Sequence, residues 1–189
     1  MKQRSGNAGF TLIEILVALV IFLVSVLGIA GLVTRTLQQE TESYQRVQAL
    51  ILLQDMVDRL NANRQVATCY SNAATGRTLG TDFDASSLAC GSGTAAQQAQ
   101  ALDDLQQWDN LLKGSAEQSA TDNSNVGAVI GARGCIRLVD AGQRIYRITV
   151  AWQGMGETVA PSNTCGQNSY GNEALRRTVS AVVRIGALS

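Results

Sequence analysis

Residues 9–33 read GFTLIEILVALVIFLVSVLGIAGLV, and this stretch decides how the rest of the chain is interpreted. From position 15 to position 33 only Ser25, Gly28 and Gly31 interrupt a run of aliphatic and aromatic residues. About 20 such residues cross the hydrocarbon core of a bilayer as an α-helix, so the stretch predicts a transmembrane helix. The small residues either permit close approach of another helix or allow local bending.

Glu14 is the one charged residue of this stretch. An unpaired charge within a membrane segment costs about 3 kcal/mol on insertion scales, so a charge at such a position usually has a partner and a function. The sequence therefore marks Glu14 as a candidate functional residue.

Charges on the two sides of the apolar segment predict its orientation. Lys2 and Arg4 precede it, whereas Arg35 is soon followed by Glu40 and Glu42. Positive residues remain on the cytoplasmic side, so the N-terminus is expected in the cytoplasm and the remainder is expected to be exported. A cleaved signal peptide is the alternative, with "GIAG" at residues 28–31 as its cleavage site, but the apolar region of a signal peptide is shorter, about 7–15 residues.

Composition limits the remaining possibilities. The chain has 189 residues, room for one domain and an anchor, and its 15 basic and 15 acidic residues give no net charge that would attract nucleic acid. Histidine is absent, which removes the commonest general base and transition-metal ligand. We therefore expect no enzymatic activity, no cofactor and no metal, and neither a small-molecule substrate nor nucleic acid as a partner.

The chain has four cysteines, and all of them follow the apolar segment: Cys69, Cys90, Cys135 and Cys165. An even number in an exported domain, without a C-x-x-C motif, predicts two disulfides. Three pairings are possible. We favour Cys69 with Cys90 and Cys135 with Cys165, because each pair closes a polar loop and would stabilise the fold by about 3–4 kcal/mol. Buried free thiols are the alternative.

The N-terminus resembles a known signal. A short basic leader, MKQRSGNAG, followed by FTLIEILVALVIFLV, is similar to the class III signal of type IV pilins and type II secretion pseudopilins. The resemblance implies that a prepilin peptidase cleaves between Gly9 and Phe10 and methylates the new amine of Phe10. Glu14 is then the fifth mature residue, which in that family pairs with the N-terminal amine of a neighbouring subunit.

Such a pair gives the charge of Glu14 a partner inside the assembled filament, where a buried charge is tolerated beside an opposite one. The alternative is that Glu14 lies at the membrane interface, where snorkelling or the helix N-terminus stabilises its charge.

The helix is expected to continue beyond the membrane. Apolar residues recur at intervals of three and four from Leu37 to Leu60, which predicts an amphipathic continuation over residues 34–63. Two acid–base pairs four residues apart are expected on its outer faces: Glu42 with Arg46, and Asp55 with Arg59.

The sequence of the C-terminal part predicts an irregular segment, a second helix and several strands. Residues 68–93 have no clear period and are expected to be irregular, whereas a second amphipathic helix is expected from Thr94 as N-cap to Gly114 as C-cap. Asp103 and Asp104, adjacent on this helix, are expected on its solvated face. Alternating residues predict a hairpin of the segments GCIRLVD (134–140) and RIYRITVAWQG (144–154) and a third strand at 176–188.

In the second hairpin strand, Tyr146, Ile148, Val150 and Trp152 are expected on the buried face and Arg147, Thr149 and Gln153 on the exposed one. A long polar loop is expected over residues 154–172, and the arginines of the hairpin region are expected to form a solvated face: Arg133, Arg137, Arg144 and Arg147.

This order of elements resembles the type IV pilin fold, and the resemblance implies an α+β structure in which a long N-terminal helix packs on a small antiparallel sheet with disulfide-tied loops. Its expected parts are a leader (1–9), a transmembrane and assembly helix (10–33), an amphipathic continuation (34–63) and a globular domain (64–189). Within the family, the segments VQALILLQDMVDRLNANR (47–64), GCI and YRITVAWQG resemble PilV-type minor pilins.

The resemblance implies a minor pilin that initiates or caps type IV pili, the filaments of twitching motility and adhesion. Its partners would be prepilin peptidase, the major pilin, other minor pilins and inner-membrane lipid. It would cross the inner membrane once, with a periplasmic C-terminal domain, before it enters the pilus on the cell surface. The alternatives are a minor pseudopilin of a type II secretion system and an exported binding module or enzyme held by an anchor.

Overall fold

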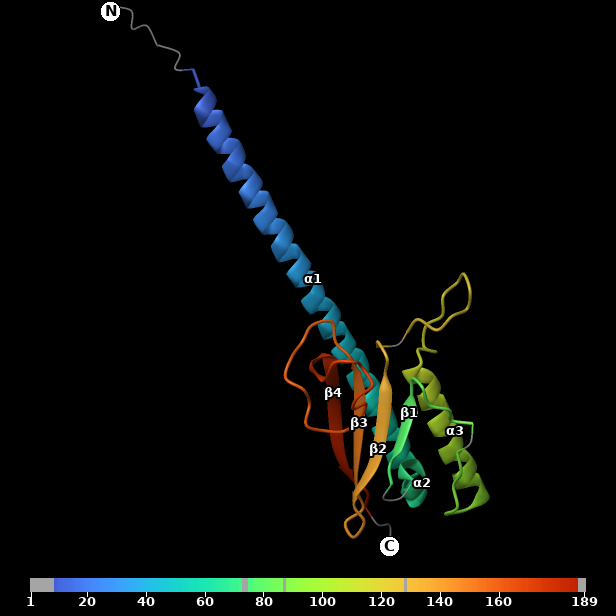
Figure 1. Cartoon of the computed structure of the whole chain (residues 1–189). Coiled ribbons are helices and arrows are strands. Elements are labelled where there is room, and N and C mark those ends of the chain that lie inside the picture. Colours follow the sequence, from blue (N-terminus) through green and yellow to red (C-terminus); the bar gives the residue numbers. More distant parts are fainter. Residues whose placement is uncertain (1–8, 73–74, 87, 128, 187–189) are drawn as a thin grey trace, which may run out of the picture. The chain divides into compact units, whose positions relative to one another are not determined.

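The computed structural model describes residues 9–72, 75–86, 88–127 and 129–186 (Figure 1). Its elements are α1 (Leu12–Ala62), η1 (Arg64–Val66), α2 (Ala67–Ser71), β1 (Arg77–Gly80), α3 (Ala95–Leu112), β2 (Arg133–Asp140), β3 (Ile145–Gln153), η2 (Glu173–Leu175) and β4 (Arg176–Arg184). The chain divides into two compact units, Met1–Thr41 and Glu42–Ser189. A long N-terminal helix, an antiparallel sheet and two disulfides confirm the α+β class predicted for the chain.

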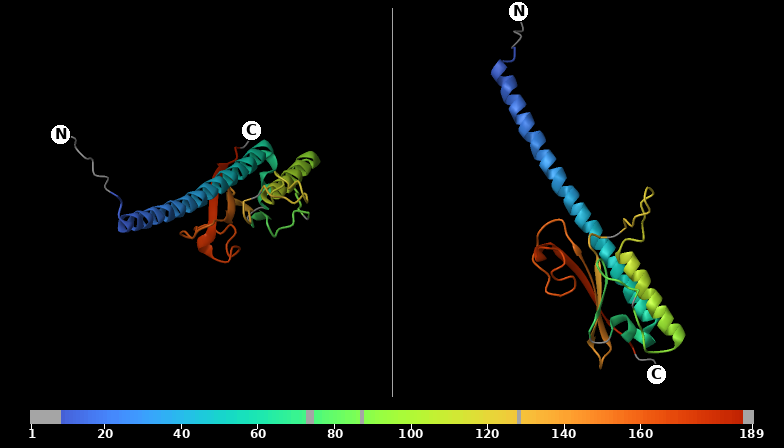
Figure 2. Two further views of the ribbon diagram at one scale, coloured as in Figure 1. Left: turned by 90° about the horizontal axis from the view of Figure 1, so that it is seen from above. Right: turned by 45° about the vertical axis from the view of Figure 1, so that its right-hand side comes forward.

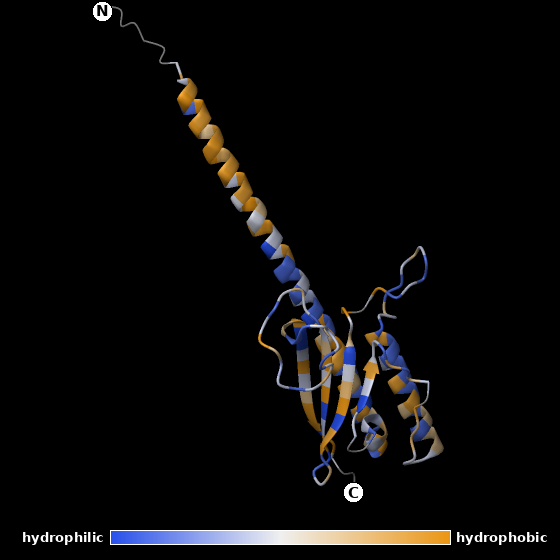
Figure 3. Ribbon diagram, in the orientation of Figure 1, coloured by the Kyte–Doolittle hydropathy of each residue, from blue (hydrophilic) through white to orange (hydrophobic). Residues whose placement is uncertain are grey.

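Helix α1 agrees with the predicted helix to within two residues at each end. Figure 3 shows the change in its surface: the ribbon is almost uniformly hydrophobic near the N-terminus and becomes mixed further along. In the first unit, every described residue of the helix is exposed.

Within the second unit, one face of α1 packs on the core of the domain. The buried residues recur every three or four positions: Gln45, Ala49, Leu52, Leu53, Met56 and Leu60. The indole Nε1 of Trp108 on α3 donates a hydrogen bond of 2.9 Å to the Leu52 carbonyl. Burial of each large apolar side chain contributes about 1.5–3 kcal/mol, so this face, and not helix propensity, holds α1 on the domain.

Helix α3 begins at the predicted N-cap, Thr94, and its C-cap is one residue before the predicted Gly114. The Thr94 hydroxyl accepts a hydrogen bond from the Gln97 amide while the Gln97 side chain accepts one from the Thr94 amide, which forms a capping box. Lys113 is the C-cap, and Gly114 follows with a positive φ of 89°, a conformation that glycine adopts without strain.

The sheet has four antiparallel strands in the order β1-β2-β3-β4, one more than the minimum that was expected. Strand β1 and helix α2 lie in the segment predicted to be irregular, and that prediction is wrong. Each element is only four or five residues long, and β1 forms because it pairs with β2, from Arg77 opposite Ile136 to Gly80 opposite Arg133. A segment this short has no usable period of its own.

The two faces of the sheet are covered by different parts of the chain. In Figures 1 and 2 the helices of the second unit lie on one face of the sheet. The core that joins residues of α1 and α3 to the sheet contains four nearly fully buried residues of β3: Tyr146, Ile148, Val150 and Trp152. The long loop that contains Cys165 covers part of the other face. Thr149 is only 3% exposed there, so the prediction that it faces solvent is wrong.

Both disulfides have the pairing that the sequence favoured. Cys69 bonds to Cys90 with Cα atoms 5.0 Å apart, and Cys135 bonds to Cys165 with Cα atoms 5.9 Å apart. The second bond ties the loop to β2, where Cys165 packs with Ala151 and Tyr170 in a small second core. This loop cover is the reason why both faces of β3 are buried near its end.

Candidate assembly site

The first turn of α1 positions the carboxylate of Glu14. The amides of Glu14 and Ile15 both donate to the Thr11 carbonyl, at 3.1 and 3.4 Å, so the helix is established by this residue. Amide groups without helical partners give the N-terminus of a helix a partial positive charge, which stabilises a carboxylate in the first turn. Glu14 is therefore held at a fixed place on the helix surface.

Glu14 and Phe10 lie together on one side of the helix N-terminus. Together with Ile15, Ala18, Leu19 and Phe22 they line a groove. A spacing of three or four residues places the side chains from Glu14 onward on one helical face, and Phe10, just before the helix begins, lies beside them. Phe10 is 80% exposed and Glu14 is also exposed, so both are accessible to another molecule. The structure thus brings together the two residues that the sequence singled out, with Gly9 next to them in the chain.

The rest of the segment offers an apolar surface with few polar groups. The hydroxyls of Ser25, Thr34, Thr36 and Thr41 each donate to the carbonyl four residues earlier, at 2.8–3.1 Å. These donors are therefore satisfied within the helix. Among the described residues α1 is the one helix that is long and apolar enough to cross a membrane, and none of its apolar window is buried.

Gly28 and Gly31 leave open space on this surface. A Cβ atom built at either position meets nothing within 4 Å. Their lack of a side chain is therefore not required by packing among the described residues, and a second helix could approach closely there.

Glu42, at the start of the second unit, connects α1 to the long loop. Its Oε1 accepts hydrogen bonds from the amides of Met155 and Gly156, at 2.9 and 3.1 Å, and from Arg177 Nη2 at 3.3 Å. The expected pair of Glu42 with Arg46 is absent among the described ion pairs, whereas Asp55 with Arg59 is present at 2.8 Å. Donors from the long loop and from β4 therefore bind the Glu42 carboxylate, and it does not pair with Arg46 on its own helix.

The pKa of Glu42 reflects these contacts. Partial burial alone would raise the pKa of the carboxyl, but hydrogen bonds from Gly156 and Met155 and the charge of Arg177 lower it below its ordinary value. A carboxyl whose pKa is lower in the folded state stabilises the fold above its unfolded pKa, about 4.3. This stabilisation is lost as the pH falls through the lower pKa of the folded protein.

We expect Glu42→Gln to lower the free energy of unfolding by about 1 kcal/mol at pH 7, since hydrogen bonds to a charged group contribute about 1.5–3 kcal/mol and screening reduces this at a partly exposed group. The side chain of Glu42 is 34% exposed. Urea unfolding of the full chain in non-ionic detergent would measure the change, with Glu117→Gln as the control at an exposed position. The difference from the wild type should shrink between pH 5 and pH 3; an undiminished difference would contradict the role of the charge.

A buried polar network lies between α1, α2 and α3. Asp104 accepts from Tyr70 at 2.5 Å, from Gln100 at 2.9 Å and from Arg59 at 3.2 Å, and it is only 5% exposed. The prediction that Asp104 lies on a solvated face is therefore wrong, whereas Asp103 is exposed as expected. Burial and the hydrogen bond to Asp104 raise the pKa of Tyr70, so its hydroxyl remains a donor.

The arginines of the hairpin region also differ from the predicted solvated face. Arg133 is 5% exposed, pairs with Asp82 and lies over the Tyr170 ring, and Arg144 donates to the Arg64 carbonyl at 2.7 Å. Arg137 and Arg147 are exposed, as expected.

Sequence reasoning missed the buried Arg176, which organises the long loop. Its guanidinium donates to the carbonyls of Pro161, Asn163 and Cys165, at 2.8–3.1 Å, and pairs with Glu173. The alternating pattern of β4 marked position 176 as a strand residue, but no local signal marks an arginine that binds a loop more than ten residues earlier.

Comparison with known protein families agrees with this geometry. Residues 4–30 match the prokaryotic N-terminal methylation motif, and residues 31–105 match the family described as type IV pilin Tt1218. Comparisons with curated proteins and with solved structures gave no match. The α+β fold, the apolar N-terminal helix and the methylation motif define a pilin-type protein. Together the two matches extend over residues 4–105 and place the chain in the type IV pilin family.

Proposed function

We propose that this protein is a PilV-type minor pilin that helps to initiate or cap type IV pili. In this proposal a prepilin peptidase cleaves between Gly9 and Phe10, the amine of Phe10 is methylated, and the chain waits in the inner membrane with its C-terminal domain in the periplasm. It acts by assembly, without catalysis or a cofactor. The observation that carries the proposal is the carboxylate of Glu14 beside Phe10, at the start of an apolar helical segment whose described residues are all exposed up to position 41.

The physical argument concerns what covers this helix. An exposed apolar surface is stable in lipid or against other helices, and the open positions at Gly28 and Gly31 would let a neighbouring helix approach. When subunits leave the membrane, only helix packing can replace lipid. The pairing of Glu14 with the amine of a neighbouring Phe10 would then fix the axial register, because a charge in an apolar filament core is costly unless it meets an opposite charge.

A minor pseudopilin of a type II secretion system is the second candidate, since the same kind of N-terminal signal serves both classes. The two candidates differ in the process that should fail when the protein is absent: pilus assembly in the first case and type II secretion in the second. The partners in the first case would be the major pilin and other minor pilins, and in the second case the pseudopilins of the secretion system.

Deletion of the gene tests the proposal when two readouts are compared. We expect the number of pili per cell to fall at least several-fold and secretion of exported proteins to remain normal, with recovery when the gene is restored. Quantitative mass spectrometry of sheared pili should find this protein at a small fraction of the amount of the major pilin. Normal piliation with failed secretion would identify a pseudopilin, and normal results in both assays would contradict an assembly role.

A further inference from the structure

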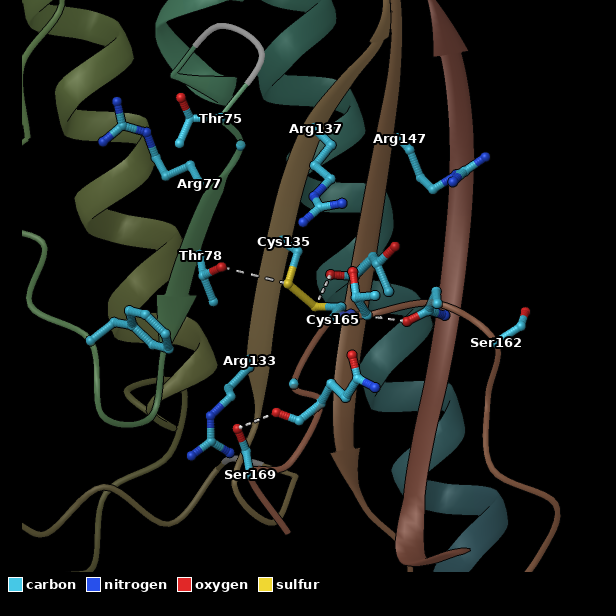
Figure 4. Close-up of a pocket in the computed structure, with 17 residues that line it drawn as sticks. Thr75, Arg77, Thr78, Arg133, Cys135, Arg137, Arg147, Ser162, Cys165 and Ser169 are labelled. Atoms are coloured by element: carbon cyan, nitrogen blue, oxygen red, sulfur yellow. Dashed lines mark hydrogen bonds between the residues drawn. A yellow bond between two sulfur atoms is a disulfide. The ribbon is translucent and has the colours of Figure 1, made fainter. Parts of the chain in front are cut away.

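The loop-covered face of the sheet contains a cavity of about 420 Å³ (Figure 4). It lies between strands β1 to β3 and the loop that carries Cys165, and the Cys135–Cys165 disulfide forms part of its wall. Because the disulfide ties the loop to β2, and Thr149 beside it is buried and bonded to Ser180, this wall has a fixed shape.

Arginines surround this cavity, and none of its described lining residues is acidic. Two of the four arginines already bond to described residues of the protein, although the Nε of Arg77 is buried without a hydrogen-bond partner among them. Arg133 is paired with Asp82, and Arg77 donates to the Cys69 carbonyl at 3.1 Å and is turned away from the disulfide in Figure 4. Arg137 and Arg147 are exposed and have no hydrogen bond or ion pair among the described residues.

Arg137 and Arg147 also stand directly opposite each other in the register of β2 and β3. Like charges at directly opposed positions destabilise a sheet. In Figure 4 the two side chains turn in different directions, Arg137 toward the disulfide and Arg147 across β4, as expected for cations with nothing between them. The fold thus places two positive charges next to each other beside a cavity. The chain as a whole has no net charge, so this pair does not follow from a general excess of arginine and lysine.

A bound oxyanion would convert this repulsion into attraction. A guanidinium presents planar N–H donors whose geometry matches phosphate oxygens, and two such groups balance two negative charges. The other polar groups of the lining, including Thr78 and Asn163, are uncharged. A phosphomonoester carries close to two negative charges at pH 7.5 and loses one below its second pKa, about 6. The second pKa of free phosphate is higher, but free phosphate is also mainly a dianion at pH 8 and a monoanion at pH 5.

We propose that this cavity is a binding site for a phosphate dianion, either free phosphate or the terminal group of a phosphomonoester, with Arg137 and Arg147 as its ligands. This site is separate from the N-terminal assembly segment, and its existence does not depend on the proposed function.

Isothermal titration calorimetry of the full chain in non-ionic detergent tests this site, with inorganic phosphate as the probe at pH 7.5. We expect Arg137→Gln and Arg147→Gln each to weaken binding at least tenfold. Arg46→Gln, which removes the same charge from an exposed position on α1, should change binding less than twofold. Equal weakening by all three variants would show a general charge effect and overturn the proposal, as would unchanged binding by Arg137→Gln and Arg147→Gln.

Three further probes define the ligand. Phosphate should bind at least fivefold more weakly at pH 5 than at pH 8, whereas sulfate, a dianion over this range, should show no such fall. Glucose 6-phosphate should bind if the site accepts monoesters, and its failure beside binding of free phosphate would assign the site to the free ion. Dimethyl phosphate, a monoanionic diester, should bind at least tenfold more weakly, and equal binding would overturn the dianion assignment.

Thermal unfolding separates ligand binding from a structural role. Without phosphate, Arg147→Gln should leave the Tm unchanged or raise it, because the variant removes the like-charge pair. With excess phosphate, the Tm of the wild type should rise and that of the variant should not. A clear fall in the Tm of the variant without phosphate would mean that Arg147 supports the fold, which contradicts the proposal.

Discussion

Replacing Gly134 by alanine should destabilise the globular domain by about 3 kcal/mol, the upper part of the usual range for overpacking. A Cβ atom at this position would lie 2.1 and 2.4 Å from Cη2 and Cζ3 of Trp108 and 2.8 Å from a methyl group of Leu112. Trp108 is fully buried and its indole is bonded to α1, so the ring cannot move aside. Gly134 itself is paired with Val150 in the middle of the sheet.

Gly91→Ala is the matched control, since a Cβ there meets nothing within 4 Å and the backbone conformation is open to any residue. Urea unfolding of both variants as full chains in non-ionic detergent would give the two free energies. We expect the control to lie within about 0.5 kcal/mol of the wild type, as for most surface changes. Equal stability of the two variants would mean that the contact of α3 with β2 is looser than the structure indicates.

The tight contact at Gly134 shows why local signals predicted some elements and not others. Helix α3 could be predicted because the Thr94 cap, the apolar period and Gly114 all lie within its own segment. Strand β3 could be predicted because apolar and polar residues alternate along much of its nine-residue length. The close packing of Trp108 on Gly134 joins residues 26 positions apart, and nothing near either residue in the sequence indicates it.

The buried Asp104 and the partly buried Glu42 could not be predicted for the same reason. Asp104 is on the face of α3 that turns toward Tyr70 and Arg59, 34 and 45 positions away. Glu42 finds its partners more than 110 positions further along. Each of these groups is charged and looks like a surface residue in the sequence, and only the tertiary fold supplies the opposite charge or donor that makes burial tolerable.

The two candidate sites also differ in how far the sequence alone could predict them. Phe10 and Glu14 are four residues apart within the segment that the sequence predicts to be one helix, so the sequence alone places them on one face; in the structure Phe10 lies just before α1. Arg137 and Arg147 are adjacent because the hairpin has a particular register, and the cavity beside them exists because a loop crosses the sheet. The hairpin was predicted, but neither the cover of its outer face nor the repulsion between the two arginines could be inferred from residue types.

Replacement of Glu14 by glutamine should leave insertion into the membrane unchanged or improved and should strongly reduce assembly into filaments. Glutamine keeps the size of the side chain and removes its charge, so a neutral residue enters hydrocarbon at lower cost. The partner amine would keep its positive charge with a weaker hydrogen bond. Removing one member of a buried ion pair costs about 3–5 kcal/mol, equivalent to at least about a 100-fold change in an equilibrium constant.

The measurement is the amount of this protein in sheared filaments and the number of filaments per cell, at matched levels in the membrane. Glu40→Gln removes the same charge from an exposed position on α1 and should assemble normally. Intact-mass analysis must show that both variants begin at a methylated Phe10, because an uncleaved leader would itself remove the partner amine. In the proposed function, other minor pilins also prime assembly, so they would preserve some filaments but not the incorporation of the variant. Normal incorporation of Glu14→Gln would contradict the pairing mechanism, and Glu14 would then be a residue stabilised at the helix N-terminus without a role in assembly.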